Sequence, residues 1–145
     1  MISLEKNKAI DKLLSFGVKA ETYQYFRIEK TSDLYNVLKS NTLPLRVLGG
    51  GSNILWTKKF QGLLLHIDTK GISIEDESDS HVIINIQAGE NWHQIVLWSL
   101  KNNYGGIENL ALIPGSVGAA PIQNIGAYGV ELKEVFIECT AINTE

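Results

Sequence analysis

The stretch from residue 109 to residue 130, NLALIPGSVGAAPIQNIGAYGV, carries no charged side chain and is interrupted repeatedly by glycine and proline. A core strand or a membrane helix does not tolerate these residues so often, because both disrupt regular backbone pairing. Glycine lacks a Cβ and adopts positive φ, so a backbone that passes close to a flat or phosphate-bearing ligand uses it repeatedly. Two interpretations follow: a backbone folded around a ligand, or two tight turns on either side of a buried segment.

A second glycine-rich segment, GGGSN at residues 49–53, lies between residues 45–48, which are apolar except for Arg46, and the apolar run 54–56. Successive backbone N–H groups without side chains form a nest for anions, and Ser52 and Asn53 add donors suited to phosphate oxygens. No Gly-Lys-Ser/Thr follows, so the segment is not a P-loop, and Ile54 occupies the third glycine position of the Rossmann fingerprint. The segment predicts either a diphosphate-binding loop or a plain hairpin turn.

Composition indicates an ordinary globular domain of 145 residues, with 44% hydrophobic and 20% charged residues. A net charge of −3 without a Lys/Arg cluster argues against a nucleic-acid or anionic-membrane surface. The first residues form no apolar signal segment, and no apolar run is long enough to span a bilayer. The lone Cys139 cannot form an internal disulfide. We therefore expect a cytoplasmic protein with no membrane segment.

The periodicity of apolar residues predicts a mixed α+β fold with elements in the order strand, helix, strands, helix, loop, strand. A first helix is expected to begin at Ser3 and end at Leu14, with Ile10, Leu13 and Leu14 on its buried face. The expected strands cover residues 21–28, 45–48, 54–56, 63–67, 72–75, 81–88 and 135–142, and further helices begin at residue 31 and cover 91–102. Residues 143–145 are typical of a turn whose return strand is missing, so we expect the chain to end inside its fold.

The sequence offers no candidate for nucleophilic or metal chemistry. His66, His81 and His93 are far apart, and a single cysteine is available, so no zinc or iron–sulfur ligand set is predicted. No G-x-S-x-G motif accompanies any serine. We interpret His93 as a surface or packing histidine. Two glycine loops with an apolar, hydrogen-bonding lining remain, which favours a site for a large cofactor that supplies its own reactivity.

Three motifs together resemble one enzyme family: GGGSNIL at 49–55, AGENWH at 88–93 and LALIPGSVGAAPIQNIGAYGVE at 110–131. They are similar to those of the UDP-N-acetylenolpyruvoylglucosamine reductases, the MurB flavoenzymes, in the longer (type I) class. The resemblance implies an FAD-binding domain of the vanillyl-alcohol-oxidase/cresol-methylhydroxylase (PCMH) type, with noncovalent FAD between two small α+β lobes. Residues 1–145 would form this domain incompletely, truncated at its C-terminal end and without the substrate-binding domain.

The resemblance also assigns cofactor-binding residues in three groups. The first group wraps the FAD diphosphate, the second passes near the diphosphate and ribityl chain, and the third lies beside the isoalloxazine. They are, in that order, Gly49, Gly50, Gly51, Ser52 and Asn53; Pro114, Gly115, Ser116, Gly118 and Ala119; and Gln123, Asn124, Ile125, Gly126, Ala127 and Tyr128.

The family uses NADPH to reduce the enolpyruvyl group of a UDP-sugar, giving UDP-N-acetylmuramate for peptidoglycan, and so serves cell-wall synthesis, cell shape and cell division. Its serine, glutamate and arginine that act on the substrate have no counterpart in residues 1–145, so we expect this fragment to be inactive and to contain no catalytic residue. Leu14-Ser15 also departs from the family's Asn-Thr before Phe-Gly.

Two other functions stay open at this point. The chain could be a noncatalytic flavin- or nucleotide-binding module or subunit, or belong to another oxidoreductase of the same FAD fold. Strand edges left without partners favour association, so a dimer through such edges is also expected.

Overall fold

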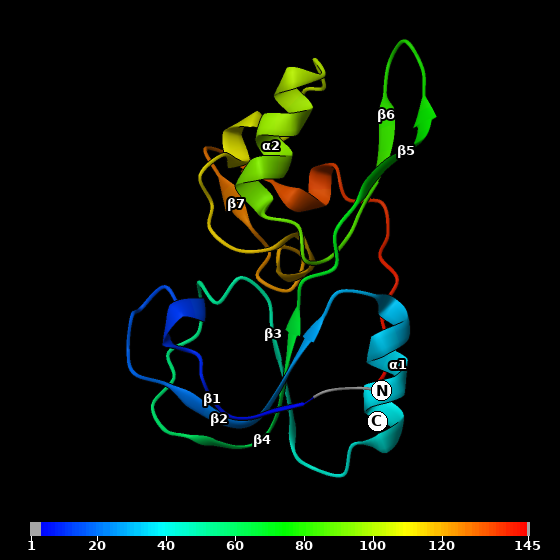
Figure 1. The fold of residues 1–145 in the computed structure, drawn as a ribbon. Helices are drawn as coiled ribbons and strands as arrows, with labels where there is room; N and C mark the ends of the chain where they lie inside the picture. The colour runs from blue at the N-terminus through cyan, green and yellow to red at the C-terminus, as the bar shows by residue number, and fades with distance from the viewer. Residues whose placement is uncertain (1–3, 145) are drawn as a thin grey trace. The chain divides into compact units, whose positions relative to one another are not determined.

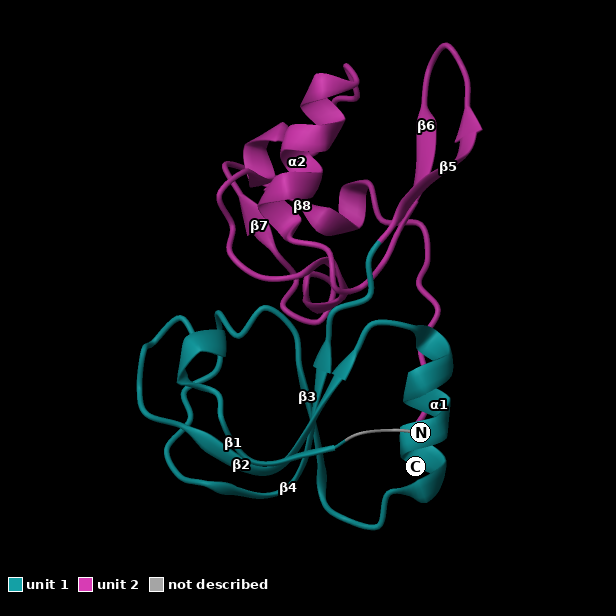
Figure 2. Ribbon diagram, in the orientation of Figure 1, with its two compact units in different colours: residues 1–70 teal, residues 71–145 magenta. Residues whose placement is uncertain are grey.

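The computed structural model describes residues 4–144, and the chain divides into two compact units, residues 1–70 and 71–145 (Figure 2). Each unit has its own secondary structure and its own hydrophobic clusters. They are described separately below.

The first unit is built on a four-stranded sheet with the strand order β1-β2-β4-β3 (Figure 1). Strands β2, β4 and β3 run parallel to one another, and β1 pairs with β2 in the antiparallel sense. The helix that connects β2 to β3 is α1, and a short 3-10 helix, η1, follows β1. The bounds are β1 Glu5–Ala9, η1 Asp11–Leu13, β2 Glu21–Ile28, α1 Thr31–Ser40, β3 Leu45–Leu48 and β4 Phe60–Ile67.

The central strand β4 is covered on both faces, as expected for a parallel strand with a continuous apolar run. On one face, Val37 of α1 packs with Ile28 and Leu65. On the other face, the segments before β2 and after β3 supply the covering residues, and Figure 1 shows α1 and η1 on opposite sides of the sheet. The members of this second cluster are Ile10, Leu14, Ala20, Tyr25, Leu48, Trp56 and Leu64.

The second unit contains one helix of three turns, two hairpins and several 3-10 turns. Asn91 caps the helix α2, because its side chain accepts a hydrogen bond from the backbone N–H of Gln94. The core of the unit forms between this helix and the loops that follow it, and includes Trp92, Val96, Leu110, Ala120, Ile125 and Leu132. The bounds are β5 Ile72–Glu77, β6 Val82–Ile86, α2 Trp92–Lys101, η2 Glu108–Leu110, η3 Val117–Ala119, β7 Gly126–Ala127, β8 Val130–Glu131 and η4 Leu132–Glu134.

The α+β class is confirmed, and so are most of the expected elements. The strand expected at residues 21–28 is β2 with the same bounds, and the helix expected from residue 31 is α1. The capped helix expected at 91–102 is α2. In each case, the local apolar pattern agrees with the face that the element buries.

Three expected elements are wrong. The first helix is replaced by β1 and η1, although Ile10 and Leu14 are buried as expected; Ser3 lies outside the described residues. Pairing of Glu5–Ala9 with β2 outweighs the local helical pattern. Residues 54–56 and 135–142 form no strand, and no described strand pairs with either segment. An extended segment becomes a strand only where a partner completes its backbone hydrogen bonds.

Candidate functional site

The glycine loop 49–53 begins directly after β3, at the carboxyl end of a parallel strand. Since β3 and β4 are parallel neighbours, the chain between them must return along the sheet, and the hairpin-turn interpretation of GGGSN is wrong. In open sheets of parallel strands, ligands bind outside the carboxyl ends. The loop therefore occupies the edge of the sheet where a ligand is expected.

The loop is fixed to η1 by its third glycine. Gly51 is buried with φ +64°, and a Cβ placed on it would lie 1.8 Å from the carbonyl oxygen of Leu13. The backbone N–H of Ser15 donates to the Gly51 carbonyl at 3.1 Å. Any larger residue at this position would push the loop away from η1, so the close approach requires glycine.

The loop carries backbone donors that the described part of the chain does not use. The N–H groups of Gly50, Gly51 and Asn53 donate to no acceptor among residues 4–144, whereas Ser52 has a partner. An N–H group left unpaired in a buried position is costly, and Gly51 is buried. A loop with several free, adjacent amides is suited to the oxygens of a phosphate group.

The side chains at the carboxyl ends of β2 and β4 are already paired with one another. Tyr25 Oη lies 2.7 Å from His66 Nδ1. Burial raises the pKa of Tyr25 and lowers the pKa of His66, so the neutral phenol donates to a neutral imidazole. Burial tends to raise the pKa of Asp68, but hydrogen bonds from Arg27 and Lys70 bring it below its ordinary value. Arg27 also pairs with Glu29, so the two cations and two carboxylates balance one another and leave no net charge for a phosphate.

Arg46, the nearest cation before the loop in sequence, is also engaged. Its guanidinium lies 5.3 Å from the centre of the Phe60 ring, in a cation–π contact. The candidate anion site in this unit therefore depends on the loop amides.

In the second unit, the loop that contains Pro114–Ala119 pairs with the AGENWH motif. Trp92 N–H donates to the Gly115 carbonyl at 3.1 Å, and Gly118 N–H donates to the Ala88 carbonyl at 2.9 Å. An isolated antiparallel bridge joins Asn91 to Ser116. Two motifs that the sequence analysis treated separately are thus held together as one structural element.

The two segments of this element are closely packed against each other. Ser116 is largely buried, with a relative exposure of 7%. A Cβ on Gly118 would lie 2.6 Å from the Ala88 Cβ, so the two segments approach too closely for a side chain. The indole N–H of Trp92 donates to the Leu110 carbonyl at 2.9 Å and fixes the start of the loop.

The third predicted group, residues 123–128, forms a turn and a short hairpin. Asn124 and Tyr128 adopt positive φ, and Tyr128-Gly129 forms the turn between β7 and β8. The Tyr128 side chain is 90% exposed, whereas Ile125 is buried in the core. The polar and aromatic members of the group are therefore available to a ligand, while the Ile125 side chain serves packing.

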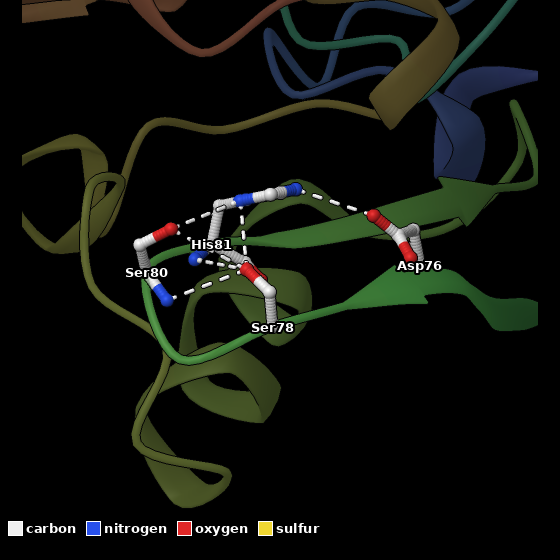
Figure 3. Close-up of polar contacts among 4 residues, drawn as sticks. All are labelled: Asp76, Ser78, Ser80 and His81. Carbon is white, nitrogen blue, oxygen red and sulfur yellow. Dashed lines mark hydrogen bonds and ion pairs between the residues drawn. The ribbon is translucent and has the colours of Figure 1, made fainter.

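A serine, a histidine and an aspartate also meet at the tip of the β5–β6 hairpin (Figure 3). Ser78 Oγ lies 2.8 Å from His81 Nδ1, and His81 Nε2 lies 3.2 Å from Asp76 Oδ2. All three side chains are exposed, and Ser78 Oγ also receives the backbone N–H of His81. Since no water-excluding pocket surrounds the serine, we interpret the cluster as stabilising the hairpin tip and not as a catalytic triad.

Among residues 4–144, no group of three or more His, Cys, Asp or Glu side chains is placed to hold a metal ion. No helix in this part of the chain has the length and apolar character needed to cross a bilayer.

Comparisons with known proteins identify a family and several similar proteins. A family model described as "FAD binding domain" matches residues 25–144. The UDP-N-acetylenolpyruvoylglucosamine reductase of Flavobacterium johnsoniae is 45% identical, in an alignment that covers 99% of this chain and 43% of the relative. The protein of the same name from Pseudomonas fluorescens is 40% identical, in an alignment that covers 99% of this chain and 43% of the relative.

A solved structure shows the same fold. The crystal structure of UDP-N-acetylenolpyruvylglucosamine reductase (MurB) from Thermus caldophilus matches with a TM-score of 0.69 at 22% identity, over 90% of this chain and 46% of that chain. This chain therefore spans less than half the length of these relatives.

Proposed function

We propose, from the premise that this chain belongs to the FAD binding domain family, that its glycine loops bind FAD. The cofactor follows from the family, and the assignment of particular residues is our proposal. In the first unit, the diphosphate is bound by Gly49, Gly50, Gly51, Ser52 and Asn53. The observation that carries this assignment is the set of unused N–H groups at the carboxyl end of β3.

In the second unit, we assign the contacts to the diphosphate and ribityl chain to Pro114, Gly115, Ser116, Gly118 and Ala119. The pairing of this loop with the AGENWH motif supports this part of the proposal, since it holds the backbone of Gly115, Ser116 and Gly118 in a fixed position. The residues that we assign to the isoalloxazine are Gln123, Asn124, Ile125, Gly126, Ala127 and Tyr128. The exposed Tyr128 ring supports that assignment.

FAD, when bound, supplies hydride transfer, which no side chain of this chain can provide. The residues present fit such a group, because they offer amide and hydroxyl donors and apolar surface rather than a base or a nucleophile. Their role is to bind and orient the cofactor: loop amides hold the diphosphate, and the exposed Tyr128 ring packs beside the isoalloxazine. We assign no catalytic residue to residues 1–145.

We further propose that this chain is the FAD-binding portion of an NADPH-dependent reductase that acts on UDP-N-acetylglucosamine enolpyruvate. The named relatives support this activity, and the chain corresponds to less than half of their length. In this proposal, residues 1–145 are part of a PCMH-type domain, and the substrate-binding domain lies outside them. Under this proposal the protein is cytoplasmic. It takes part in peptidoglycan synthesis and thereby supports cell shape and cell division.

The two proposals are tested separately. FAD binding is tested by adding FAD to the purified chain and measuring flavin retained after ultrafiltration; retention is expected, and complete loss of flavin contradicts binding. The activity is tested on the longest product of the gene that encodes this chain. NADPH oxidation that depends on the enolpyruvyl sugar nucleotide is expected, and oxidation that ignores this substrate contradicts the reductase assignment.

We also propose that isolated chains of this length can associate through the free edge of β6. The segment Val82–Ile86 carries no charge, and β5 is its only strand partner among the described residues. An uncharged edge with unpaired backbone groups is a template for pairing with a second copy. A concentration-dependent increase of mass in light scattering is expected, and a monomer at all concentrations contradicts the proposal.

A further inference from the structure

Leu112 lies in an unusual backbone conformation within the loop that leads to Pro114–Ala119. Its φ is +64°, in the left-handed region that favours glycine, and its side chain is 77% exposed. A leucine in this region is strained, and an exposed side chain gains little burial energy in return. Some other interaction must therefore hold this backbone in place.

A histidine on α2 supplies that interaction. The backbone N–H of Leu112 donates to His93 Nδ1 at 3.2 Å. An N–H group can only donate, so Nδ1 must carry the lone pair and Nε2 the proton in a neutral ring. His93 lies in the first turn of α2, whose start is fixed by the Asn91 cap and the burial of Trp92. The acceptor therefore sits on a rigid element.

The residues on either side of Leu112 are anchored independently. Leu110 is fully buried, and its carbonyl accepts the indole N–H of Trp92. Ser116 is fixed by its bridge to Asn91. The Gly115 carbonyl is held by the Trp92 backbone N–H. Leu112 thus lies between two anchors, and its conformation sets the path of residues 113–114.

We propose that His93 is a positioning residue for the FAD-binding loop: it holds Leu112 in the left-handed conformation and thereby places Pro114, which leads into the anchored Gly115 and Ser116. This inference rests on the proposed function, because it assumes that these residues contact FAD. His93 does not touch the cofactor in this proposal, and it acts through the Leu112 amide.

The test uses three variants and two measurements. His93→Ala removes the acceptor and is expected to raise the dissociation constant for FAD about fivefold to tenfold, the effect of one hydrogen bond. His93→Asn keeps an acceptor near the Nδ1 position and is expected to restore binding to within about twofold. His81→Ala, at the exposed hairpin tip, is the matched control and is expected to leave binding unchanged.

A second-site variant distinguishes positioning from general damage. Glycine adopts φ +64° without strain, so in a Leu112→Gly background the His93→Ala change is expected to alter the FAD dissociation constant less than about twofold. A histidine that only stabilised α2 would produce the same loss in both backgrounds. Equal losses in the two backgrounds, or no loss in either, would overturn the inference.

Hydrogen exchange separates this inference from the proposed function. In the chain without FAD, the Leu112 amide is expected to exchange at least about tenfold faster in His93→Ala than in the parent chain. If the parent chain retains no FAD, the proposed function fails, but the exchange measurement still tests the hydrogen bond. If FAD binds and Leu112 exchanges equally fast in both chains, the positioning role is refuted.

Discussion

Replacing Gly51 with alanine tests the claim that the diphosphate loop is shaped by contact with η1. The new Cβ would lie 1.8 Å from the Leu13 carbonyl oxygen and 2.9 Å from its carbonyl carbon, so the backbone of one segment must move. The left-handed conformation at φ +64° adds about 1–2 kcal/mol. Relief of the overlap adds about 1–3 kcal/mol. We expect the free energy of unfolding to fall by roughly 2–5 kcal/mol.

Gly17 provides a closely matched control for this measurement. Its φ is +62°, and nothing lies within 4 Å of a Cβ placed on it. Gly17→Ala therefore bears only the conformational cost, about 1–2 kcal/mol. Urea unfolding followed by circular dichroism gives both values. If Gly51→Ala destabilises the chain no more than Gly17→Ala does, the close packing of the loop on η1 is refuted.

Three further predictions concern the other parts of the candidate site. Gly118→Ala, which overlaps Ala88, is expected to weaken FAD retention and to be rescued by Ala88→Gly; failure of the rescue would show that the contact is not the cause. Burial lowers the pKa of His66 below 6.5 in the folded chain, so the unfolded chain binds more protons at this residue. The contribution of His66 to the free energy of unfolding is therefore complete above about pH 6.5 and is lost as the pH falls toward the folded pKa. His66→Asn retains an acceptor for Tyr25 and should flatten that dependence in urea titrations, whereas an unchanged slope would assign it to other groups. Asn91→Ala should cost about 1 kcal/mol by loss of the α2 cap, and a change near zero in thermal unfolding would contradict it.

The sequence predicted those parts of the fold that depend on local pattern. The strand β2, the helix α1 and the capped helix α2 each bury the face that their apolar residues mark. The buried positions Ile10 and Leu14 were also predicted correctly, although the element around them is not a helix. Hydrophobicity thus indicated what is buried more reliably than it indicated the conformation that buries it.

The errors concern features that depend on residues remote in sequence. Glu5–Ala9 is a strand because β2 lies beside it, and residues 135–142 form none because no described strand accepts them. In the candidate site, the sequence shows that both loops are rich in glycine. It does not show which contacts require glycine at positions 51 and 118. The residues that require Gly51 and Gly118 are Leu13 and Ala88, and their proximity follows only from the tertiary fold.

The hydrogen bonds that hold the loop leading to Pro114–Ala119 were also not predicted, because they too depend on the tertiary fold. The AGENWH motif contributed to the resemblance, but its sequence does not reveal that Trp92 and His93 bind the backbone at Leu110 and Leu112. His93 was interpreted as a surface or packing histidine, and its contact with a positive-φ residue was detectable only in the structure.

Titration of FAD with the purified chain tests the central claim most directly. We predict saturable binding at one FAD per chain, with a changed flavin absorption spectrum, that is weakened by Gly51→Ala and by Gly118→Ala. Gly51→Ala tests the loop of the first unit and Gly118→Ala tests the loop of the second unit, each by itself. A flavin spectrum identical to that of free FAD at excess protein, with all flavin passing through the ultrafiltration membrane, would contradict the account.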